Sequence, residues 1–595
     1  MNLLLVVAVG GIILFIASRT YARVIAAQFD PDDSRPTPAD ACADGVDFVK
    51  SPSTVVFAHH FASIAGAGPI IGPIIALSYG WGPAWLWIVI GGIFYGAVHD
   101  MSSMFVSLRE GGKTIAEVAR RTLGTSGYIL FLLLLLIVIS VVNAIFLKLS
   151  ASALQSAYPL ASLGLNESQS LLRTRVTDNG ETVGIIGGIA TTSVIVMTLV
   201  APFLGWLIHK RHVPTFPVFV LAGIIGAAGV VLGFFMPVSL SMNTWQFVLV
   251  MYLFFASWIP VWLIIQPRDF MNVQILYGGL ILLVVGTLVA GISGGDTATM
   301  QMPIERISEG SAATGPVWPI MFITIACGAI SGFHSLVATG TTIKQIPRES
   351  DCRRVGYNAM ILESFLALLV LGAVASQMTF NEYGTTMTSG GGWILTFAVG
   401  CGRLFSELGI PIAIGSVLGI LIIEGFLVTT LDTSVRLTRY LVEELAQQLG
   451  IVPKDRSTRG MQIAGAAIAI GLMLIFVFSK EALDAMWPFF GAGNQLIGAL
   501  TLTTVGIWLL QRGKSPWFAL VPAIFMVATA IAALMYKVRD KFDADEPSTY
   551  IFAAAGMVLL LLACGFVIVA TIRFALALRQ ATAITADETR EHTTN

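Results

Sequence analysis

Residues 55–79 decide the fold of this chain, and they read VVFAHHFASIAGAGPIIGPIIALSY. The stretch is long and apolar enough to cross the hydrocarbon of a bilayer, yet two adjacent histidines precede a run of glycines and prolines. Glycine and proline interrupt the helical ladder, and unpaired amides at membrane depth persist only inside protein or beside a wet cavity. The stretch therefore predicts a discontinuous membrane helix that borders a cavity. A kinked packing helix with small residues for close approach is the alternative, and the histidines favour the cavity.

A second stretch, residues 325–343, repeats this pattern as IACGAISGFHSLVATGTTI, with His334 between glycines and a threonine-rich end. Two interrupted helices far apart in one chain indicate a transporter binding site. The reason is that half-helix N-termini attract anionic groups while freed carbonyls hold cations. The pair predicts a place for both charge signs.

Composition places the chain in lipid. It has 595 residues, of which 56% are hydrophobic and 12% charged, whereas a soluble domain is about one quarter charged. The formal net charge of -1 offers no broad basic field, so a nucleic-acid partner is not expected. The five cysteines show no CxxC spacing, which argues against a disulfide framework and a zinc site.

Hydropathy predicts an all-α polytopic membrane protein with about 15 to 16 transmembrane helices. The apolar segments are residues 2–18, 55–79, 84–106, 127–147, 183–208, 216–236, 245–265, 273–292, 317–339, 358–378, 410–431, 461–478, 485–509, 517–536 and 550–572. Residues 392–408 are apolar but short and carry Arg403 and Glu407, so they are expected to be re-entrant or interfacial. Residues 21–54 and 150–181 are hydrophilic enough for soluble excursions.

The charge pattern predicts the topology. Lysine and arginine in short loops mark the cytoplasmic side, and every basic cluster falls there if the N-terminus lies outside and the C-terminus inside. The two broken segments then run in opposite directions, which suits an inverted repeat. The predicted organisation is an N-terminal extra helix (1–20), a first half of the core (55–292, broken helix 55–79), a second half (317–510, broken helix 317–342), C-terminal helices (511–579) and a disordered tail (580–595).

Several polar residues within apolar runs are further site candidates, because ionisable groups inside a membrane are costly. They are His99, Asp100, Glu363, Glu424, Asp432, Asn494 and Gln495. Asp432 precedes Arg436 by four residues, so a simple ion pair at the helix end is its alternative role. The run WPFFGAGNQ at residues 487–495 is interpreted as a third broken element, whose amide pair binds substrate or satisfies the backbone at the kink.

Three rival functions remain open at the level of sequence. Residues 291–294 read GISG and match the short GxSG pattern of an intramembrane hydrolase, although a turn at a helix end explains the glycines. A metal held by His59, His60, His99 and His334 is conceivable, but no i, i+4 ligand pair such as HExxH is present. A passive channel would also use broken helices, but it could not drive flux uphill.

The quoted motifs, together with GAVHDMSSMFVSLREGGKTIAEV at residues 96–118 and WPFFGAGNQL at residues 487–496, resemble the carbon starvation protein A (CstA) family. The resemblance extends from about residue 55 to beyond residue 495. It implies a secondary active transporter that imports peptides or pyruvate across the bacterial inner membrane during carbon starvation, by proton symport. It also implies an inverted-repeat core of the amino acid–polyamine–organocation (LeuT/APC-like) type and a small accessory protein as a partner.

The resulting site hypothesis has two parts. The substrate carboxylate is expected at the amides around the first break, and the substrate-binding candidates are Gly66, Ala67, Gly68, Gly72, Ser331, Gly332, Thr339, Asn494 and Gln495. The candidates for ion or proton coupling are His59, His60, His334, Asp100 and Asp432. Histidine suits this role because its unperturbed pKa of about 6.5 lets modest changes in environment switch its charge. No catalytic residue, metal or cofactor is expected beyond a proton or sodium as the coupling ion.

Overall fold

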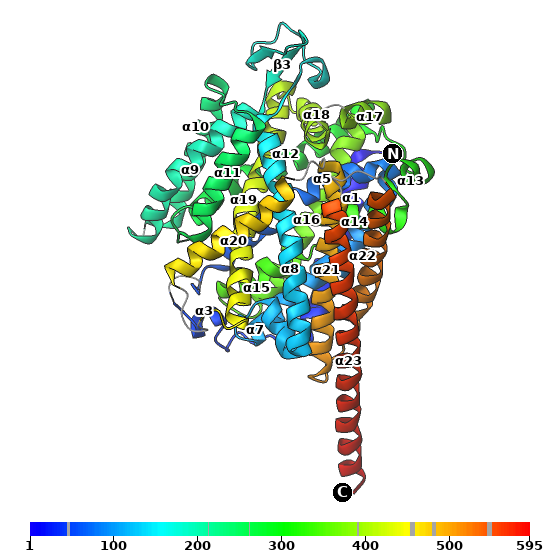
Figure 1. Ribbon diagram of the computed structural model, residues 1–595. Coiled ribbons are helices and arrows are strands. Elements are labelled where there is room, and N and C mark those ends of the chain that lie inside the picture. Colours follow the sequence, from blue (N-terminus) through cyan, green and yellow to red (C-terminus); the bar gives the residue numbers. More distant parts are fainter. Residues whose placement is uncertain are drawn as a thin grey trace.

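The protein is a bundle of membrane-length helices (Figure 1). The structure is a computed structural model that describes all residues except 45–47, 212, 261, 389–391, 453–457, 479–482, 544–549 and 595. Among the described residues, twelve helices are long and apolar enough to cross a membrane, or up to thirteen if the bent pair Ser53–Ile64 and Gly68–Tyr79 counts as one span. The expected all-α polytopic class is thereby confirmed, whereas the described residues contain fewer such helices than the 15 to 16 expected.

Among its described residues, the first half of the chain contains twelve α-helices and a small sheet. The helices are α1 (Leu3–Arg19), α2 (Tyr21–Ala27), α3 (Pro38–Ala41), α4 (Ser53–Ile64), α5 (Gly68–Ala76), α6 (Trp81–Gly91), α7 (Ala97–Arg109), α8 (Ile115–Gln155), α9 (Gly187–His209), α10 (Thr215–Phe235), α11 (Met242–Trp258) and α12 (Ile265–Ser293). A π-helical turn, Gly92–Gly96, joins α6 to α7. The strands β1 (Ala157–Pro159), β2 (Thr174–Val176) and β3 (Thr182–Ile185) form an antiparallel sheet in the order β1-β3-β2.

The second half repeats the order of the first. After α13 (Ile307–Thr314) come a π-helical turn (Val317–Met321), α14 (Phe322–Thr324) and α15 (Phe333–Gly340), and then a second π-helical turn (Arg353–Tyr357) that leads into α16 (Asn358–Gln377). The remaining helices are α17 (Phe380–Thr388), α18 (Gly392–Ser406), α19 (Ile412–Gln448), α20 (Arg459–Val477), α21 (Leu483–Leu510), α22 (Trp517–Asp543) and α23 (Tyr550–Thr594). Each half therefore has a broken helix, then a helix with a π-helical turn, and then a very long helix, which α17 and α18 precede in the second half.

Local sequence fixes several helix starts. The side chains of Asn2, Thr114, Ser241 and Thr458 each accept a hydrogen bond from a backbone amide three residues on, at the starts of α1, α8, α11 and α20. Such N-caps satisfy one of the four amides that a helix start leaves without an intrahelical acceptor.

The two broken segments lie side by side and run in opposite directions. Just before α4, the Ser51 amide donates to the Gln345 carbonyl (3.1 Å), which lies past the end of α15. At the opposite end, the Tyr79 hydroxyl donates to the Gly315 carbonyl (2.8 Å), just before the second segment begins. The start of each segment therefore lies beside the end of the other.

The helices that follow each broken segment obey the same rule. Arg109, at the end of α7, pairs with Glu349 (2.5 Å), which lies just before the π-helical start of α16. Thr114, at the start of α8, donates to Glu444 (3.3 Å) near the end of α19. Because three successive elements pair antiparallel with their counterparts, the core is an inverted repeat, as expected.

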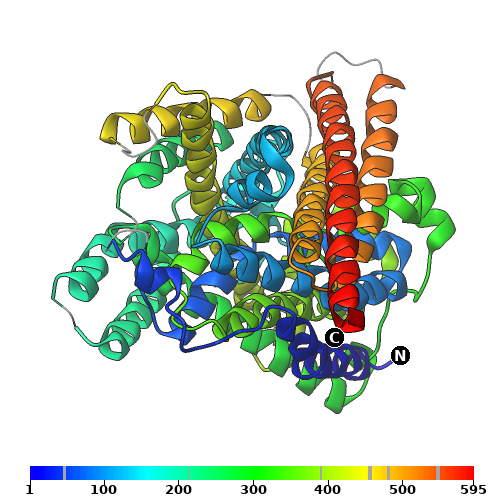
Figure 2. The same ribbon diagram turned by 90° about the horizontal axis from the view of Figure 1, so that it is seen from below.

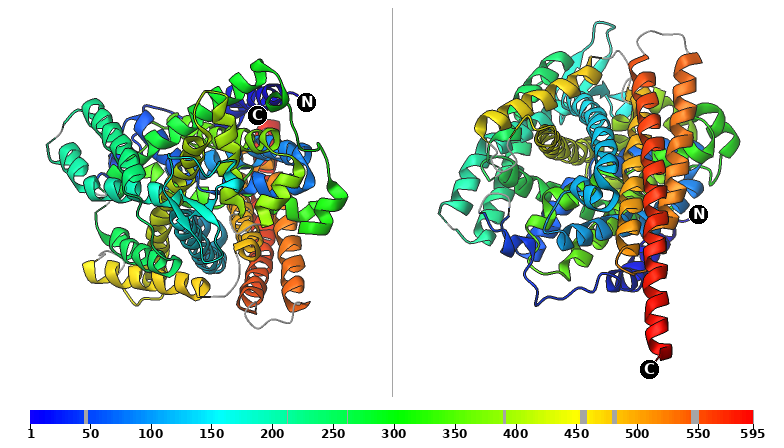
Figure 3. Two further views of the ribbon diagram at one scale, coloured as in Figure 1. Left: turned by 90° about the horizontal axis from the view of Figure 1, so that it is seen from above. Right: turned by 60° about the horizontal axis from the view of Figure 1, so that its bottom comes forward.

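Additional elements surround this core. Helices α9 and α10 pack on each other as a hairpin at one edge of the molecule, and α22 and α23 stand beside α21 at another (Figures 1 and 2). The sheet lies at one end of the bundle, and α23 extends past the other end (Figures 1 and 3). The α9–α10 hairpin accounts for the extra helices between the two broken segments.

Several predicted elements differ from the structure. Residues 317–339 are not one helix, because the chain unwinds from Ile325 between α14 and α15. Residues 245–265 correspond to α11, which has 17 residues. The third broken element is wrong, because α21 runs unbroken through Pro488. Residues 580–594 continue α23 as a helix, where composition predicts a disordered tail, and residue 595 lies outside the described residues. Residues 392–406 form α18, a short apolar helix, and their re-entrant placement stays a prediction.

The molecule is apolar outside and charged inside. Large apolar side chains on α1, α9, α10, α22 and α23 are exposed, whereas Asp100, Arg268, Glu363, Glu424 and Asp432 are buried. This distribution is the one expected of a protein whose solvent is lipid, because polar groups at membrane depth must find partners within the bundle.

Gly72 tests the contact between the two breaks. A Cβ at Gly72 would lie 2.8 Å from the Thr324 carbonyl oxygen and 3.1 Å from the Ile325 Cα, and backbone atoms cannot rotate away. We expect Gly72→Ala to destabilise the protein by about 1–3 kcal/mol, the usual cost of overpacking, measured as a lower Tm in detergent.

Gly471→Ala is the matched control, because Gly471 lies within α20 and a Cβ there meets nothing within 4 Å. Alanine removes the entropic cost of a helical glycine, so this variant should be as stable as the wild type or more stable by about 0.5–1 kcal/mol. Equal Tm values for the two variants would contradict the contact.

Candidate functional site

The two breaks form one site at the centre of the core. The helices α4 and α5 meet at 45°, and the unwound residues between them lie against the unwound part of the second segment. A Cβ on Gly68 would overlap the Cys327 side chain, so glycine is required for this approach. Gly66 lies against Phe146 of α8 and Thr430 of α19, which places the first break between both long helices.

Amide side chains of α21 satisfy the backbone at the second break. Asn494 Oδ1 accepts from the Phe333 amide (2.9 Å), the first residue of α15, and its backbone carbonyl accepts from the Gly332 amide (3.0 Å). Asn494 Nδ2 donates to Ser331 Oγ (3.0 Å), and Gln495 Nε2 donates to the Phe322 carbonyl. Of the two roles considered for this amide pair, the contacts show backbone satisfaction, at the break of another segment.

A chain of titratable side chains lies beside the second break. The Asp100 carboxylate lies between two histidines, with Oδ1 2.7 Å from His99 Nδ1 and Oδ2 2.8 Å from His334 Nδ1. The other nitrogen of His334, Nε2, lies 3.4 Å from Glu363 Oε2. All four side chains are 0% exposed, and they join α7, α15 and α16. We call His99, Asp100, His334 and Glu363 the proton network.

The far end of the proton network is incompletely paired. Neither carboxylate oxygen of Glu363 has a hydrogen-bond partner among the described residues. A buried carboxylate without donors is tolerated only when a proton or a cation neutralises it. The geometry therefore places a carboxylate that needs a neutralising proton or cation next to the unwound backbone.

Cys327 extends this cluster. Its thiol, a ring nitrogen of His334 and a carboxylate oxygen of Glu363 all lie within 4.8 Å of one another and are buried. The set offers three ligand atoms, one fewer than the four of a structural zinc site. It also differs from the four-histidine set considered from the sequence, because the described part of the chain does not bring those four rings together.

His59 and His60, the other two histidines of that four-histidine set, lie apart from the network. His60 Nδ1 lies 2.9 Å from Thr342 Oγ1, just past the end of α15. His59 instead lines a largely apolar cavity of about 730 Å³ between α4, α9, α10 and α12, together with Asp269 and Tyr277. Of the predicted coupling histidines, the structure therefore places only His334 in an ion-paired chain.

Asp432 belongs to a second buried cluster. Its Oδ2 lies 2.5 Å from Arg268 Nη1 of α12 and accepts from the Tyr252 hydroxyl of α11 (2.9 Å). The alternative of a pair with Arg436 is wrong, because Arg436 Nη2 donates to two backbone carbonyls at the end of α11. Sequence reasoning missed Arg268, although an arginine three residues into a long apolar helix is a signal. Asp432 thus has a resident cation and holds α11, α12 and α19 together.

Thr339 also has a structural partner. Its Oγ1 accepts from the Ile115 amide (3.0 Å), the first residue of α8, and donates to the Ser335 carbonyl (2.7 Å). The hydroxyl therefore ties the end of the second broken segment to the start of α8.

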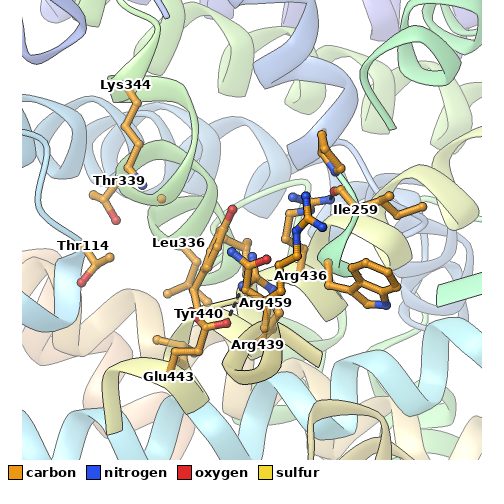
Figure 4. A pocket seen from close by; sticks show the side chains of 16 residues that line it. Thr114, Ile259, Leu336, Thr339, Lys344, Arg436, Arg439, Tyr440, Glu443 and Arg459 are labelled. Atoms are coloured by element: carbon orange, nitrogen blue, oxygen red, sulfur yellow. Dashed lines mark hydrogen bonds and ion pairs between the residues drawn. The ribbon is translucent and has the colours of Figure 1, made fainter. Parts of the chain in front are cut away.

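A basic cavity of about 600 Å³ opens beside this contact (Figure 4). Its charged lining consists of Lys344, Arg436, Arg439, Arg459 and Glu443, with Thr339 and Tyr440 between them. From sequence these cations served to set the topology, and Arg436 was also the alternative partner of Asp432. We call this space the basic cavity.

Ser293 of the GxSG motif has no catalytic surroundings among the described residues. Its hydroxyl donates to the Ala290 carbonyl (3.1 Å) within the last turn of α12, and a Cβ at Gly294 or Gly295 would meet nothing within 4 Å. Gly294 of the motif serves a turn at the helix end, whereas Gly291 lies within α12, where a Cβ would overlap the Leu4 side chain of α1.

Asn494 provides a test of its role at the break. Asn494→Ala removes the acceptor for the buried Phe333 amide, and an unsatisfied buried group costs about 1–3 kcal/mol. We expect a lower Tm without substrate. Thr501→Val is the control, because its partner Ser335 also donates to Gly332 and stays satisfied. An Asn494→Ala protein with the wild-type Tm but weaker substrate binding would assign the amide to the substrate.

The chain matches known proteins over most of its length. The family model described as "Carbon starvation protein CstA" matches residues 2–385 and 374–533. The "Peptide transporter CstA" of Bacillus subtilis (strain 168) is 28% identical over 611 residues, covering 96% of each chain. The "Pyruvate/proton symporter BtsT" of Escherichia coli (strain K12) is 27% identical over 612 residues, covering 88% of this chain and 80% of that protein. The crystal structure of MhsT in complex with L-phenylalanine aligns with a TM-score of 0.48 at 12% identity, over 86% of this chain and 99% of that one.

Proposed function

Because this chain belongs to the carbon starvation protein CstA family, we propose that it is a secondary transporter that imports peptides, pyruvate or both by proton symport during carbon starvation. The names of the relatives support both substrates, since one is a peptide transporter and another a pyruvate/proton symporter. Both substrates carry a carboxylate. The enzyme alternative finds no support, because the matched relatives are transporters.

The proposed proton coupling rests on one observation, the buried chain Asp100–His334–Glu363. A transport proton needs a group that is shielded from bulk water and able to exist in two charge states. His334 meets both requirements, with a carboxylate on each side of its ring. It also lies one turn from the second break, so protonation and backbone geometry affect each other.

The proposed mechanism couples this proton to the substrate. The carboxylate binds the amides at the start of α5, where Gly68 at the first helical position has no intrahelical acceptor. A proton in the network offsets the charge that the substrate brings between α8 and α19. Alternating access then follows from rocking of one set of repeat helices against the other. Sodium held by carbonyls and threonines is the alternative coupling ion.

We propose that the N-terminus lies outside and the C-terminus in the cytoplasm of the bacterial inner membrane. Arg109, Arg121 and Arg512 all pair with acidic groups on one face of the bundle, Glu349 or Glu110. That is the end past which α23 extends (Figure 1), whereas the N-terminus lies toward the opposite end. Basic residues mark the cytoplasmic side. A small accessory protein stays a prediction.

Proteoliposome uptake tests the proton site. Wild-type accumulation of pyruvate or a dipeptide should rise as the outer pH falls below the inner pH, because the proton gradient then drives inward symport. Gradient-driven accumulation by His334→Gln and by Glu363→Gln should be about 5- to 150-fold lower than that of the wild type. This factor is the usual range of coupling between two sites. Substrate exchange at equal pH on both sides should persist in Glu363→Gln, because exchange needs no net proton movement.

Glu382→Gln is the control, because this exposed glutamate pairs with Arg403 far from the network, and it should accumulate substrate like the wild type. Uptake that is independent of pH, or driven by sodium alone, would contradict the proton site. Flux that no gradient drives uphill would instead indicate a channel. Competition of pyruvate uptake by dipeptides decides whether the two substrates share the site.

A further inference from the structure

The basic cavity carries more positive charge than its walls neutralise. Four cations, Lys344, Arg436, Arg439 and Arg459, line it against one carboxylate, Glu443. Arg439 pairs with Glu443, which leaves a formal excess of three positive charges. No salt bridge joins Lys344, Arg436 or Arg459 to a carboxylate within the part of the chain that the structure describes.

Two of these cations are deeply buried with unused donors. Arg436 is 7% and Arg439 4% exposed, and the Nε atom of each has no hydrogen-bond partner among the described residues. Lys344 Nζ lies 5.2 Å from the Phe48 ring centroid and 5.7 Å from that of Tyr440. Leaving buried donors and charges unpaired costs free energy, so the cavity favours an occupant that brings anionic oxygens.

The walls of the cavity come from two different parts of the fold. Leu336, Thr339 and Gly340 of α15, followed by Lys344, form one wall, and α19 and α20 contribute the three arginines. In Figure 4, Lys344 and Thr339 lie on one side while Arg436, Arg439 and Arg459 converge on the other. An anion that contacts both walls would tie the end of the second broken segment to the long helix α19.

We propose that the basic cavity is a regulatory site for a small solute with two or more anionic groups, which bridges Lys344 and the α19–α20 arginines and slows transport. A monovalent carboxylate neutralises only one of three excess charges, so multivalent carboxylates and phosphates are the ligand class. The site is distinct from the proton network, because His334 and Glu363 do not line it. Binding does not depend on the proposed function, whereas the effect on transport rests on it.

Binding is tested with citrate on the full-length protein in nanodiscs of phosphatidylcholine. Citrate should raise the Tm above that in chloride at equal ionic strength, whereas pyruvate should not. Lys344→Gln and Arg459→Gln should each weaken citrate binding about tenfold, the equivalent of about 1.4 kcal/mol for one lost contact. Neither side chain holds a carboxylate in the described structure, so both variants should fold.

Arg512→Gln is the matched control, because Arg512 is a partly exposed arginine of the same face that pairs with Glu110 outside the cavity, and it should bind citrate like the wild type. Citrate that acts no more strongly than chloride, or variants that bind it like the wild type, would overturn the proposal. In nanodiscs with phosphatidylglycerol, citrate should still bind. Loss of binding there, with a lipid-dependent rise in Tm that Lys344→Gln abolishes, would assign the cavity to a lipid phosphate instead.

The effect on transport is tested with citrate trapped on one side of proteoliposomes. Citrate on the side of the basic cavity should slow substrate exchange, and Lys344→Gln should relieve the inhibition. Citrate binding that has no effect on exchange would overturn the regulatory role, although the binding site itself would stand. Absence of exchange in every condition, with citrate still binding, would be a failure of the proposed function alone.

Discussion

The structure depends on one constraint, that every backbone amide and carbonyl at membrane depth must find a partner inside the protein. Two membrane segments of this chain lose their helical hydrogen bonding at their centres, and the fold places the two breaks against each other. Gly68 and Gly72 let the backbones approach, and Asn494 and Gln495 of α21 satisfy groups on both sides of the second break. The two segments pair antiparallel, with the start of each beside the end of the other, and this pairing brings both central breaks to the same level.

The same constraint sorts the buried charges into two kinds. Asp432 meets Arg268 and a tyrosine hydroxyl, so its carboxylate has a permanent cation as a partner and holds three helices together. In the proton network the carboxylates outnumber the permanent cations, and its charge depends on protons. A cluster of the first kind resists change, whereas one of the second kind responds to it. Under the proposed proton symport, this difference favours His334 over Asp432 as the proton-coupling group.

Sequence predicted the breaks because glycine, proline and histidine together are rare in a regular lipid-facing helix, and residues 55–79 and 325–343 do contain breaks. It also predicted most spans, since hydropathy needs only local information. It could not show that Asp100 and Glu363 meet at His334, because they are 263 residues apart along the chain and only the inverted pairing of helices joins them. The break predicted at residues 487–495 was wrong because tertiary contacts overrode the local sequence. Its glycines and Pro488 are typical of a break, yet tertiary contacts with the unwound segment keep α21 helical.

The short helix α15 links the two charged regions of the molecule. His334, near its start, belongs to the proton network, while Leu336, Thr339 and Gly340 line the basic cavity. A displacement of α15 would change both environments together, because eight residues form a rigid unit between the break and the contact of Thr339 with α8. Linkage is reciprocal, so an anion that favours one position of α15 must change the affinity of the network for its proton, and the proton must change the affinity for the anion by the same factor. Under the two proposals, proton and anion act on one element from its two sides.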